Sequence, residues 1–278
     1  MARRLRFAAL VLLAVLAACG RSADDAPSAD EGSDHLIGHV HGLGINPADD
    51  MLYVAGHNGV FRVEDGTPIR VADRWQDTMA FTIVGPDTFL ASGHPDLRED
   101  LPPHLGLIES TDAAESWKPL SLQGEADFHA LEIVGERIYG YDATSGQLMT
   151  TKDRETWETV TTGEYVDLAT RPSQPDRVLA TTPTGAVYEI RLDGTQRRLA
   201  DAPRVVLIDS TSQGRIVGVT AGGEVYSTSW LVDQWRAVGE VPGPPAALAA
   251  TDGVWHVATD EAVLSSTDDG ATWTDVLG

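Results

Sequence analysis

Short runs of apolar residues alternate with turn residues along the chain from residue 36 to its end. Gly, Pro, Asp and Asn break these runs repeatedly, and no segment in this part of the chain has the 3.6-residue apolar period of an amphipathic helix. Runs of this length, bounded by turn formers, are typical of β-strands. The pattern therefore predicts a fold that is nearly all β.

The apolar runs repeat with a period of about forty residues. Each repeat opens with a segment that has a large apolar residue at its third place and mostly small residues around it. The six copies begin at His41, Met79, His129, Val166, Val206 and Ala246, at intervals of 38, 50, 37, 40 and 40 residues. An insertion at residues 95–104 accounts for the long interval. It is rich in Pro and charged residues and is predicted to form a loop.

Every opening run is followed by a second and a third apolar run, and in several repeats a fourth lies beside a tryptophan. Four strands in about forty residues, repeated six times, match a β-propeller. We therefore predict one domain, residues 36–278, that folds as a six-bladed β-propeller of four-stranded antiparallel blades. The opening runs become the innermost strands, where blades crowd together. The tryptophans are expected in the core between blades: Trp117, Trp157, Trp235 and Trp273.

The end of the sixth repeat, residues 266–273, contains a motif that recurs in weaker copies. A second copy spans residues 110–117 and has Ala114 where the last copy has Gly270, and a third, at residues 151–157, is one residue shorter. Aspartate can satisfy turn amides, Gly270 allows a positive φ, and the tryptophan can pack under the turn. We interpret the motif residues as structural: Ser266, Asp268, Gly270, Trp273, Ser110, Asp112, Trp117, Asp153 and Trp157.

This Ser-x-Asp-x-Gly-x-Thr-Trp pattern resembles the Asp-box, or bacterial neuraminidase repeat, of sialidase-like β-propellers. The opening of the first repeat, residues 39–44, is also similar to that of small bacterial lipoproteins of the glycosyl hydrolase-like, exo-α-sialidase-like group. The resemblance implies a propeller, and it raises the question of glycosidase activity. Sialidases carry an Arg-Ile-Pro-like motif on an early inner strand and three substrate-binding arginines. Here the inner strands carry His and Met instead, which argues against sialidase activity.

The N-terminus has the features of an export signal. Arg3, Arg4 and Arg6 precede an apolar run, residues 7–18, that is too short to cross a bilayer. The run ends at Cys19, the one cysteine of the chain, in a context that resembles a bacterial lipobox. We predict a lipoprotein signal peptide at residues 1–18 and a lipidated Cys19 at the head of a disordered acidic tether, residues 19–35. The alternative is an ordinary secretory signal with an incidental cysteine.

The charge of the chain excludes one class of partner. The formal net charge is −22, and removal of the three signal arginines leaves 17 basic against 42 acidic residues, a net charge of −25. Nucleic acids and anionic lipid head groups are poor partners for such a surface. Membrane attachment must then come from lipid on Cys19, which places the propeller, expected to be a monomer, on the extracytoplasmic side of a bacterial membrane.

Histidines concentrate in the first three repeats at matching positions. One position is the start of the innermost strand, and the other is the end of the second strand; both open on the same face of a propeller. Packing would treat all six blades alike, so this clustering indicates a site. The histidines at these positions are His41, His57, His94 and His129, with His39 two residues before His41. Three histidines fall outside the pattern: His35, His104 and His256. We interpret them as surface histidines or as histidines whose ring nitrogens are already hydrogen-bonded.

Imidazoles together with a thioether favour copper, particularly Cu(I), whereas three imidazoles and a carboxylate also suit zinc. The metal hypothesis, with copper first and zinc second, takes His41, His57, His94, His129 and Met79 as ligands, with His39 and Asp142 in secondary roles. Two alternatives remain open. The histidines can line a polar channel and bond to backbone groups, or they can form a pocket for a sugar or an anion.

Two further functions remain open at this stage. A pair of carboxylates on the same face could hydrolyse a glycoside, and the weak candidates are Asp96, Asp142 and Asp167, with Asp127 also available. The propeller could also be a scaffold for an envelope complex, a role that resembles that of the Asp-box photosystem assembly factors and sortilin-like receptors. Whether the ligand is a small molecule, a glycan or an envelope protein is not fixed by the sequence.

Overall fold

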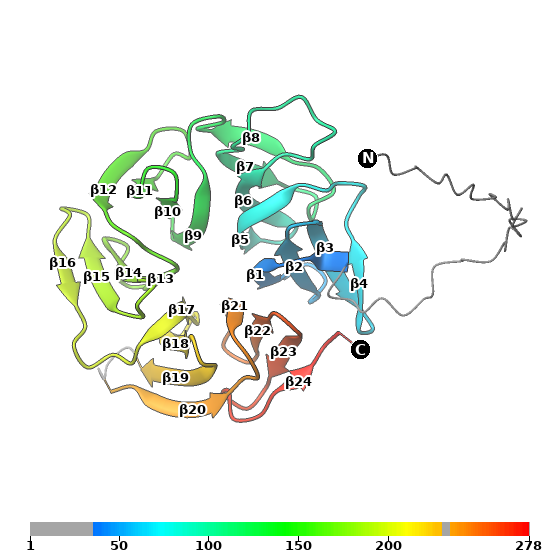
Figure 1. The fold of residues 1–278 in the computed structure, drawn as a ribbon. Coiled ribbons are helices and arrows are strands. Elements are labelled where there is room, and N and C mark those ends of the chain that lie inside the picture. The colour runs from blue at the N-terminus through cyan, green and yellow to red at the C-terminus, as the bar shows by residue number, and fades with distance from the viewer. Residues whose placement is uncertain (1–35, 230–233, 278) are drawn as a thin grey trace, which may run out of the picture. The chain divides into compact units, whose positions relative to one another are not determined.

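In a computed structural model, which describes residues 36–229 and 234–277, twenty-four strands form six four-stranded antiparallel sheets. The sheets follow one another in chain order around a central axis, from β1 near the axis in blade 1 to β24 at the rim of blade 6 (Figure 1). Each innermost strand contacts the innermost strand of the next blade, and β21 of the sixth blade contacts β1. The prediction of a six-bladed β-propeller is confirmed.

In every blade the four strands are neighbours in chain order, from the axis to the rim. Blades 1 and 2 consist of β1 (Val40–Ile45), β2 (Leu52–Gly56), β3 (Gly59–Glu64), β4 (Thr67–Arg70), β5 (Asp77–Gly85), β6 (Thr88–His94), β7 (Leu107–Ser110) and β8 (Lys118–Ser121). Blades 3 and 4 consist of β9 (Phe128–Val134), β10 (Arg137–Asp142), β11 (Gln147–Thr151), β12 (Glu158–Thr162), β13 (Leu168–Thr170), β14 (Arg177–Thr181), β15 (Val187–Arg191) and β16 (Gln196–Arg198). Blades 5 and 6 consist of β17 (Val205–Ser210), β18 (Arg215–Thr220), β19 (Glu224–Ser229), β20 (Arg236–Glu240), β21 (Pro245–Ala250), β22 (Trp255–Thr259), β23 (Val263–Ser266) and β24 (Thr274–Asp275).

The apolar core is divided between the blade interfaces. Six clusters of buried side chains each contain residues of two adjacent blades, so that every blade packs on both neighbours. The predicted tryptophans belong to these clusters; Trp157, for example, lies 4.7 Å from the Phe128 ring and donates its indole N–H to Ser121. Alternating apolar residues of the strands thus bury one face against each neighbouring sheet, as the repeat pattern requires.

The ring closes by side-chain packing between its ends. Blade 1 is built entirely from the first four strands and blade 6 from the last four, so no strand is exchanged between them. One core cluster joins Ile37, Val40 and Val54 of the beginning of the domain to Ala247 and Leu277 of its end. Burial of this apolar surface, at roughly 25 cal/mol per Å², is what holds the two ends together.

Small residues on the innermost strands allow the blades to approach closely. A Cβ atom added at Gly42 of β1 would lie 2.7 Å from the Cβ atom of Phe81 in β5, and one at Gly44 would lie 2.8 Å from Ile83. These separations are shorter than any normal carbon contact. The preference for small residues in the opening runs therefore follows from crowding near the axis.

The turns between third and fourth strands are held by their own side chains. In the last repeat, Asp268 Oδ1 accepts the Ser266 hydroxyl at 2.9 Å and the Thr272 N–H at 2.9 Å, while Ser266 Oγ accepts the Gly270 N–H. The second copy repeats these bonds around Ser110 and Asp112. Such bonds replace backbone pairing within the turn, so these side chains are engaged in structure.

Two innermost strands begin two residues away from the predicted start, whereas the other four begin one residue early. The strand β5 begins at Asp77, two residues before the predicted start, because Asp77 pairs with His94 of β6 across a β-bulge between Thr78 and Ala80. The strand β13 begins at Leu168, two residues late, because Val166 and Asp167 both bond to the backbone of Thr181, which interrupts the regular register. Among the residues that the structure describes, no helix is long and apolar enough to cross a membrane.

Candidate metal centre

Six histidines gather at one end of blades 1 to 3. They lie before or at the start of the innermost strands, at or just beyond the end of the second strands, or in the insertion of blade 2: His39, His41, His57, His94, His104 and His129. Two aspartates, Asp77 and Asp127, precede or open the innermost strands of blades 2 and 3. The side chains form two groups that could each hold a metal ion, and in each group the three ligand atoms lie within 4.8 Å of one another.

The first group consists of His41, His57 and Asp77. His41 extends from β1, and His57 follows β2 directly, so their rings stack with centroids 4.7 Å apart. His41 Nε2 lies 3.5 Å from Asp77 Oδ1, which comes from blade 2. His39 stands edge-on beside them, with its centroid 5.0 Å from that of His41. The group therefore spans the interface of blades 1 and 2.

The second group consists of His94, His104 and Asp127. Asp127 Oδ2 lies 3.7 Å from His94 Nε2, 3.8 Å from His104 Nδ1 and 3.1 Å from His129 Nε2. Three imidazoles from blade 2, its insertion and blade 3 thus surround a single carboxylate. His129 is hydrogen-bonded to that carboxylate and stands beside the group.

Backbone groups orient the ligands of the second group. His94 Nδ1 is 2.9 Å from the Pro103 carbonyl oxygen, which can only accept a proton, so Nδ1 carries hydrogen and Nε2 is left as a donor to a metal. The carbonyl of His104 accepts the N–H of Gly124. The expectation that His104 lies outside the site is wrong, because the insertion folds back onto β6 and brings His104 beside His94, with ring centroids 5.6 Å apart.

The residues of both groups fit a bound cation. In these two groups, four buried polar atoms have no hydrogen-bond partner among the residues that the structure describes: His41 Nε2, Asp77 Oδ1, His104 Nδ1 and Asp127 Oδ1. Buried polar atoms without partners cost roughly 1–3 kcal/mol each, so such atoms require an explanation. An ion coordinated by these nitrogen and oxygen atoms would remove the cost in both groups.

Local electrostatics keep both carboxylates charged. Burial alone would raise the pKa of Asp127, but the His129 contact and the charges of His94 and His104 lower it overall. Burial likewise opposes ionisation of Asp77, and His41 and His57 outweigh it, so that its pKa is lowered. Burial, followed by His41, lowers the pKa of His39. The charged carboxylate is the form that binds a metal ion.

The other predicted site residues have different positions. Met79 lines the pocket at the axis together with His41 and His129, and it belongs to neither His/Asp group. Asp142 is buried, and its carboxylate accepts the N–H groups of Asp127 and Thr144 and the Ser145 hydroxyl. Its position makes it a support for Asp127. Cys19 lies outside the described residues.

Asp96, one of the catalytic candidates, forms hydrogen bonds that hold the insertion of blade 2 in place. Its two oxygens accept the guanidinium of Arg98 and the N–H groups of Arg98 and Trp75. The Arg98 hydrogen bond holds the pKa of Asp96 well below its usual range, even though burial acts against this. The residue therefore anchors the loop that carries His104.

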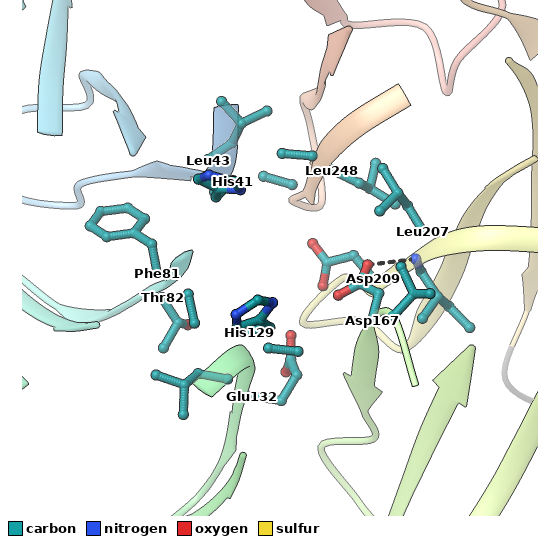
Figure 2. Close-up of a pocket in the computed structure, with 18 of the residues that line it drawn as sticks. His41, Leu43, Phe81, Thr82, His129, Glu132, Asp167, Leu207, Asp209 and Leu248 are labelled. Atoms are coloured by element: carbon teal, nitrogen blue, oxygen red, sulfur yellow. Dashed lines mark hydrogen bonds between the residues drawn. The ribbon is translucent and has the colours of Figure 1, made fainter. Parts of the chain in front are cut away.

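A pocket of about 690 Å³ lies at the axis and is lined by residues of all six blades (Figure 2). His41 and His129 stand on its wall, and Glu132, Asp167 and Asp209 lie across from His41 (Figure 2). These carboxyl groups join neighbouring blades: Asp167 accepts the N–H of Ile208 at 2.8 Å, Asp209 accepts that of Ala250 at 2.6 Å, and Glu132 accepts the Thr170 hydroxyl. Asp167 is thus a link between blades 4 and 5.

Asp167 makes the stability of the propeller depend on pH. Burial raises its pKa to about 7, against the opposing effect of the hydrogen bonds from Ile208 and Leu168. An unfolded aspartate releases its proton near pH 4, so the native state holds more protons between these values. The stabilising contribution is complete below about pH 4 and is lost as the pH rises to about 7.

We expect Asp167→Asn to reduce the change in unfolding free energy between pH 5 and pH 8 by about 1–3 kcal/mol, a range that allows for water in the pocket. Asparagine loses one of the two backbone hydrogen bonds at every pH, so the difference between the two pH values is the measured quantity. Urea unfolding of both proteins gives it. Asp193→Asn, at an exposed turn where hydrogen bonds lower the aspartate pKa, should leave the difference unchanged. An unaltered pH dependence in Asp167→Asn would show that this carboxyl is already charged in the native state.

Comparisons with known proteins establish the fold. No family model matches the chain, and no curated protein matches it. Among solved structures it is similar to YCF48 bound to D1 peptide, with a TM-score of 0.53, 16% identity, and coverage of 86% of this chain and 81% of that one. Virginiamycin B lyase from Staphylococcus aureus matches with a TM-score of 0.58 and 11% identity, and the match covers 88% of this chain and 86% of the lyase chain. The GH74 enzyme of Niastella koreensis matches with a TM-score of 0.62 and 13% identity, and the match covers 85% of this chain and 45% of the enzyme chain.

Identities this low show a shared β-propeller and carry no information on activity. Propellers of this kind place different chemistries on the same scaffold, so the function of this chain must be argued from its own site. The class that the fold and the site define is a β-propeller with His/Asp groups that could bind metal.

Proposed function

We propose that this protein is a lipid-anchored, extracytoplasmic β-propeller that binds divalent transition metal ions at its two His/Asp groups. The proposal depends most on four buried ligand atoms that have no hydrogen-bond partner within residues 36–229 and 234–277: His41 Nε2, Asp77 Oδ1, His104 Nδ1 and Asp127 Oδ1. A structural channel in which the histidines bond to backbone groups does not account for these four atoms, because none of them has such a partner among the described residues.

The donor set favours particular metals. Each group offers two imidazoles and one carboxylate, a combination that suits zinc and copper(II). Copper(I) prefers soft ligands such as the thioether of Met79, which lines the axial pocket, whereas each group contains a hard carboxylate. We therefore place zinc and copper(II) together ahead of copper(I).

Other parts of the proposal come from the sequence. Anchoring depends on the lipobox-like ending at Cys19, and the extracytoplasmic location follows from it. The kinship with Asp-box propellers is supported by the turn hydrogen bonds of Ser266 and Asp268. A glycosidase gains no support from Asp96 and Asp142, because hydrogen bonds to turns and to the backbone of Asp127 occupy their carboxylates.

The test is metal analysis of the full chain, purified without a histidine tag, stripped with chelator and titrated with Zn²⁺ or Cu²⁺. We expect binding that weakens by about 100-fold or more at the first group in His57→Ala and at the second group in His94→Ala, since even residues that only support a metal ligand contribute 10- to 100-fold. Asp50→Asn removes a carboxylate from the β1–β2 turn, at the opposite end of these strands, and should bind as the natural protein does. Equal affinity in all four proteins would refute the proposal.

A further inference from the structure

Exposed large apolar side chains are confined to one sector of the propeller. Within the described part of the chain, all side chains of this kind lie between residues 36 and 101, and each is at least 41% exposed: Leu36, Ile69, Trp75, Leu97 and Leu101. This stretch forms blade 1 and the inner half of blade 2, which are neighbours in the ring (Figure 1). Single exposed apolar residues are normal on any protein, but their concentration in one sector indicates a contact surface.

Hydrogen bonds and an ion pair hold Trp75 against the tip of the insertion. The Trp75 N–H donates to Asp96 Oδ2 at 3.1 Å, and Asp96 Oδ1 accepts the N–H of Arg98 at 2.9 Å. The Arg98 guanidinium reaches back to Asp73, with 3.0 Å between Nη1 and Oδ2. Leu97 lies between two anchored residues and is completely exposed. The loop therefore holds this leucine out in the solvent.

The exposed part of the Trp75 ring is apolar. Its indole N–H donates to Asp73 Oδ1 at 3.1 Å, so the polar edge of the ring is satisfied within the chain. The Arg70 guanidinium carbon lies over the ring, 3.4 Å from its centroid. Tryptophan and arginine are both typical of membrane interfaces, where rings and aliphatic stems are buried and charged heads stay in water. We call Trp75, Leu97 and Leu101, which comes later in the same insertion, the apolar patch.

The chain enters the propeller beside the apolar patch. The carbonyl of Leu36, the first described residue, accepts the side-chain N–H of Asn58. The carbonyl of Asn58 accepts the Nε–H of Arg70, the residue that stacks on the patch tryptophan. Residues 20–35 separate Leu36 from Cys19, the predicted site of the lipid, and such a length spans at most about 60 Å. An anchor at Cys19 acts on the propeller at Leu36, so the sector with the patch is held nearest to the membrane.

The charged groups around the patch nearly cancel. Arg98 pairs with Asp73 and Asp96, and Arg74 pairs with Glu99 at 3.2 Å. An apolar surface without a strong charge suits the boundary between the head groups and acyl chains of zwitterionic lipid. The net charge of the whole chain, −22, opposes contact with anionic lipid.

The size of the patch argues against a second copy of the chain as the occupant. Three partly or fully exposed side chains offer a few hundred Å², whereas a stable protein interface buries about 800 Å² on each partner. A lipid surface does not need this area. Because the anchor already holds the protein at the bilayer, a weak second contact is sufficient.

From these observations we propose that the apolar patch docks on zwitterionic lipid of the membrane that holds the anchor. Trp75, Leu97 and Leu101 enter the boundary between head groups and acyl chains. This inference rests on the lipid anchor of the proposed function. Two points of attachment fix the orientation of the propeller. Since Leu101 is three residues from His104, the docked protein holds its second His/Asp group close to the membrane.

The depth of the patch in a bilayer is the direct test. The full chain is expressed, and the lipid-anchored protein is reconstituted in phosphatidylcholine vesicles. Asp100→Cys places a spin label between Leu97 and Leu101 without changing either, and it adds the one free thiol, because the natural chain has a single cysteine, the lipidated Cys19. Collisions of the label with oxygen and with a water-soluble nickel complex report its depth by electron paramagnetic resonance. We expect the label about 5–10 Å inside the boundary region.

Two variants provide the controls. Asp193→Cys carries the same label at an exposed turn of blade 4, and this label should stay in water. Leu97→Ser, combined with Asp100→Cys, removes a side chain that packs against nothing, so it should fold normally and return the label at position 100 to water. High salt should not release the natural patch from phosphatidylcholine, and added phosphatidylglycerol should weaken its docking.

The outcomes separate docking from anchoring. A label buried in the bilayer that Leu97→Ser returns to water supports both. A label in water, on a protein whose mass shows lipid at Cys19, overturns docking and leaves the anchor intact, and the absence of lipid at Cys19 overturns both. A buried label that Leu97→Ser leaves in place, or docking that requires phosphatidylglycerol and low salt, overturns the apolar contact. Magnetic coupling between the labels of two copies would assign the patch to a second copy and overturn the lipid contact.

Discussion

Replacing Gly93 by alanine is expected to lower the free energy of unfolding by about 3 kcal/mol or more and to weaken metal binding at both His/Asp groups. Gly93 is the residue before His94, at the end of β6, and its φ of 141° is one that other residues rarely adopt. A Cβ atom there would lie 2.0 Å from the Asp77 carbonyl oxygen and 2.8 Å from the Met79 nitrogen. Backbone strain and the clash each cost about 1–3 kcal/mol.

The clash acts directly on the site. Relief requires β5 and β6 to separate where Asp77 pairs with His94, and the Gly93 carbonyl also accepts the N–H of Leu105, next to His104. One substitution that touches no ligand atom should therefore reduce Zn²⁺ affinity in both groups. Urea unfolding and zinc titration measure the two effects.

Gly85→Ala is the matched control in the same hairpin. A Cβ atom at Gly85 would meet nothing within 4 Å, so we expect stability within about 0.5 kcal/mol of the natural protein and unchanged zinc affinity. If Gly93→Ala behaved like Gly85→Ala, the close pairing of Asp77 with His94 would be contradicted.

Zinc is expected to stabilise the folded protein strongly, and chelation should reverse the effect. A ligand that binds only the native state adds about 4 kcal/mol when its free concentration is 1,000 times Kd. For a domain of this size each kcal/mol corresponds to about 2–4 °C in Tm. Each occupied group should therefore raise Tm by about 8–16 °C, measured by calorimetry with and without excess chelator.

The contributions of the two groups can be separated by substitution. His57→Ala and His94→Ala should each retain part of the zinc-dependent rise in Tm, and the double variant should retain none. Mg²⁺ at the same concentration should have no effect, because it prefers oxygen ligands and gives up its water reluctantly. A full rise in the double variant would mean that zinc stabilises the protein elsewhere.

The repeat in the sequence was sufficient to predict the fold. Alternating apolar runs at a period of about forty residues predicted six blades of four strands, and the structure has them. The structural role of the turn motif could also be predicted from the sequence. In the turn around Asp268, the hydrogen bonds join residues that are only two to four positions apart. Information of this kind is contained in short segments, so it needs no knowledge of distant contacts.

The candidate site was predicted only in part. Matching positions in the repeats identified His41, His57, His94 and His129 as neighbours on one face. Asp77 was missed because it precedes the apolar run by two residues, although its place just before the start of an innermost strand was a usable signal. His104 carried no such signal, since an insertion has no counterpart in the other repeats.

The sequence by itself determined the number of blades and the face on which the histidines gather. Only the tertiary structure decided that the histidines divide into two groups, each with its own aspartate, and that the ring closes by packing of Leu277 against the first blade. The physical reason is distance along the chain. Periodicity shows which residues are equivalent in the repeats. It does not show which side chains meet across blades or which path a loop such as residues 95–104 follows, because both depend on contacts between residues that are distant in the sequence.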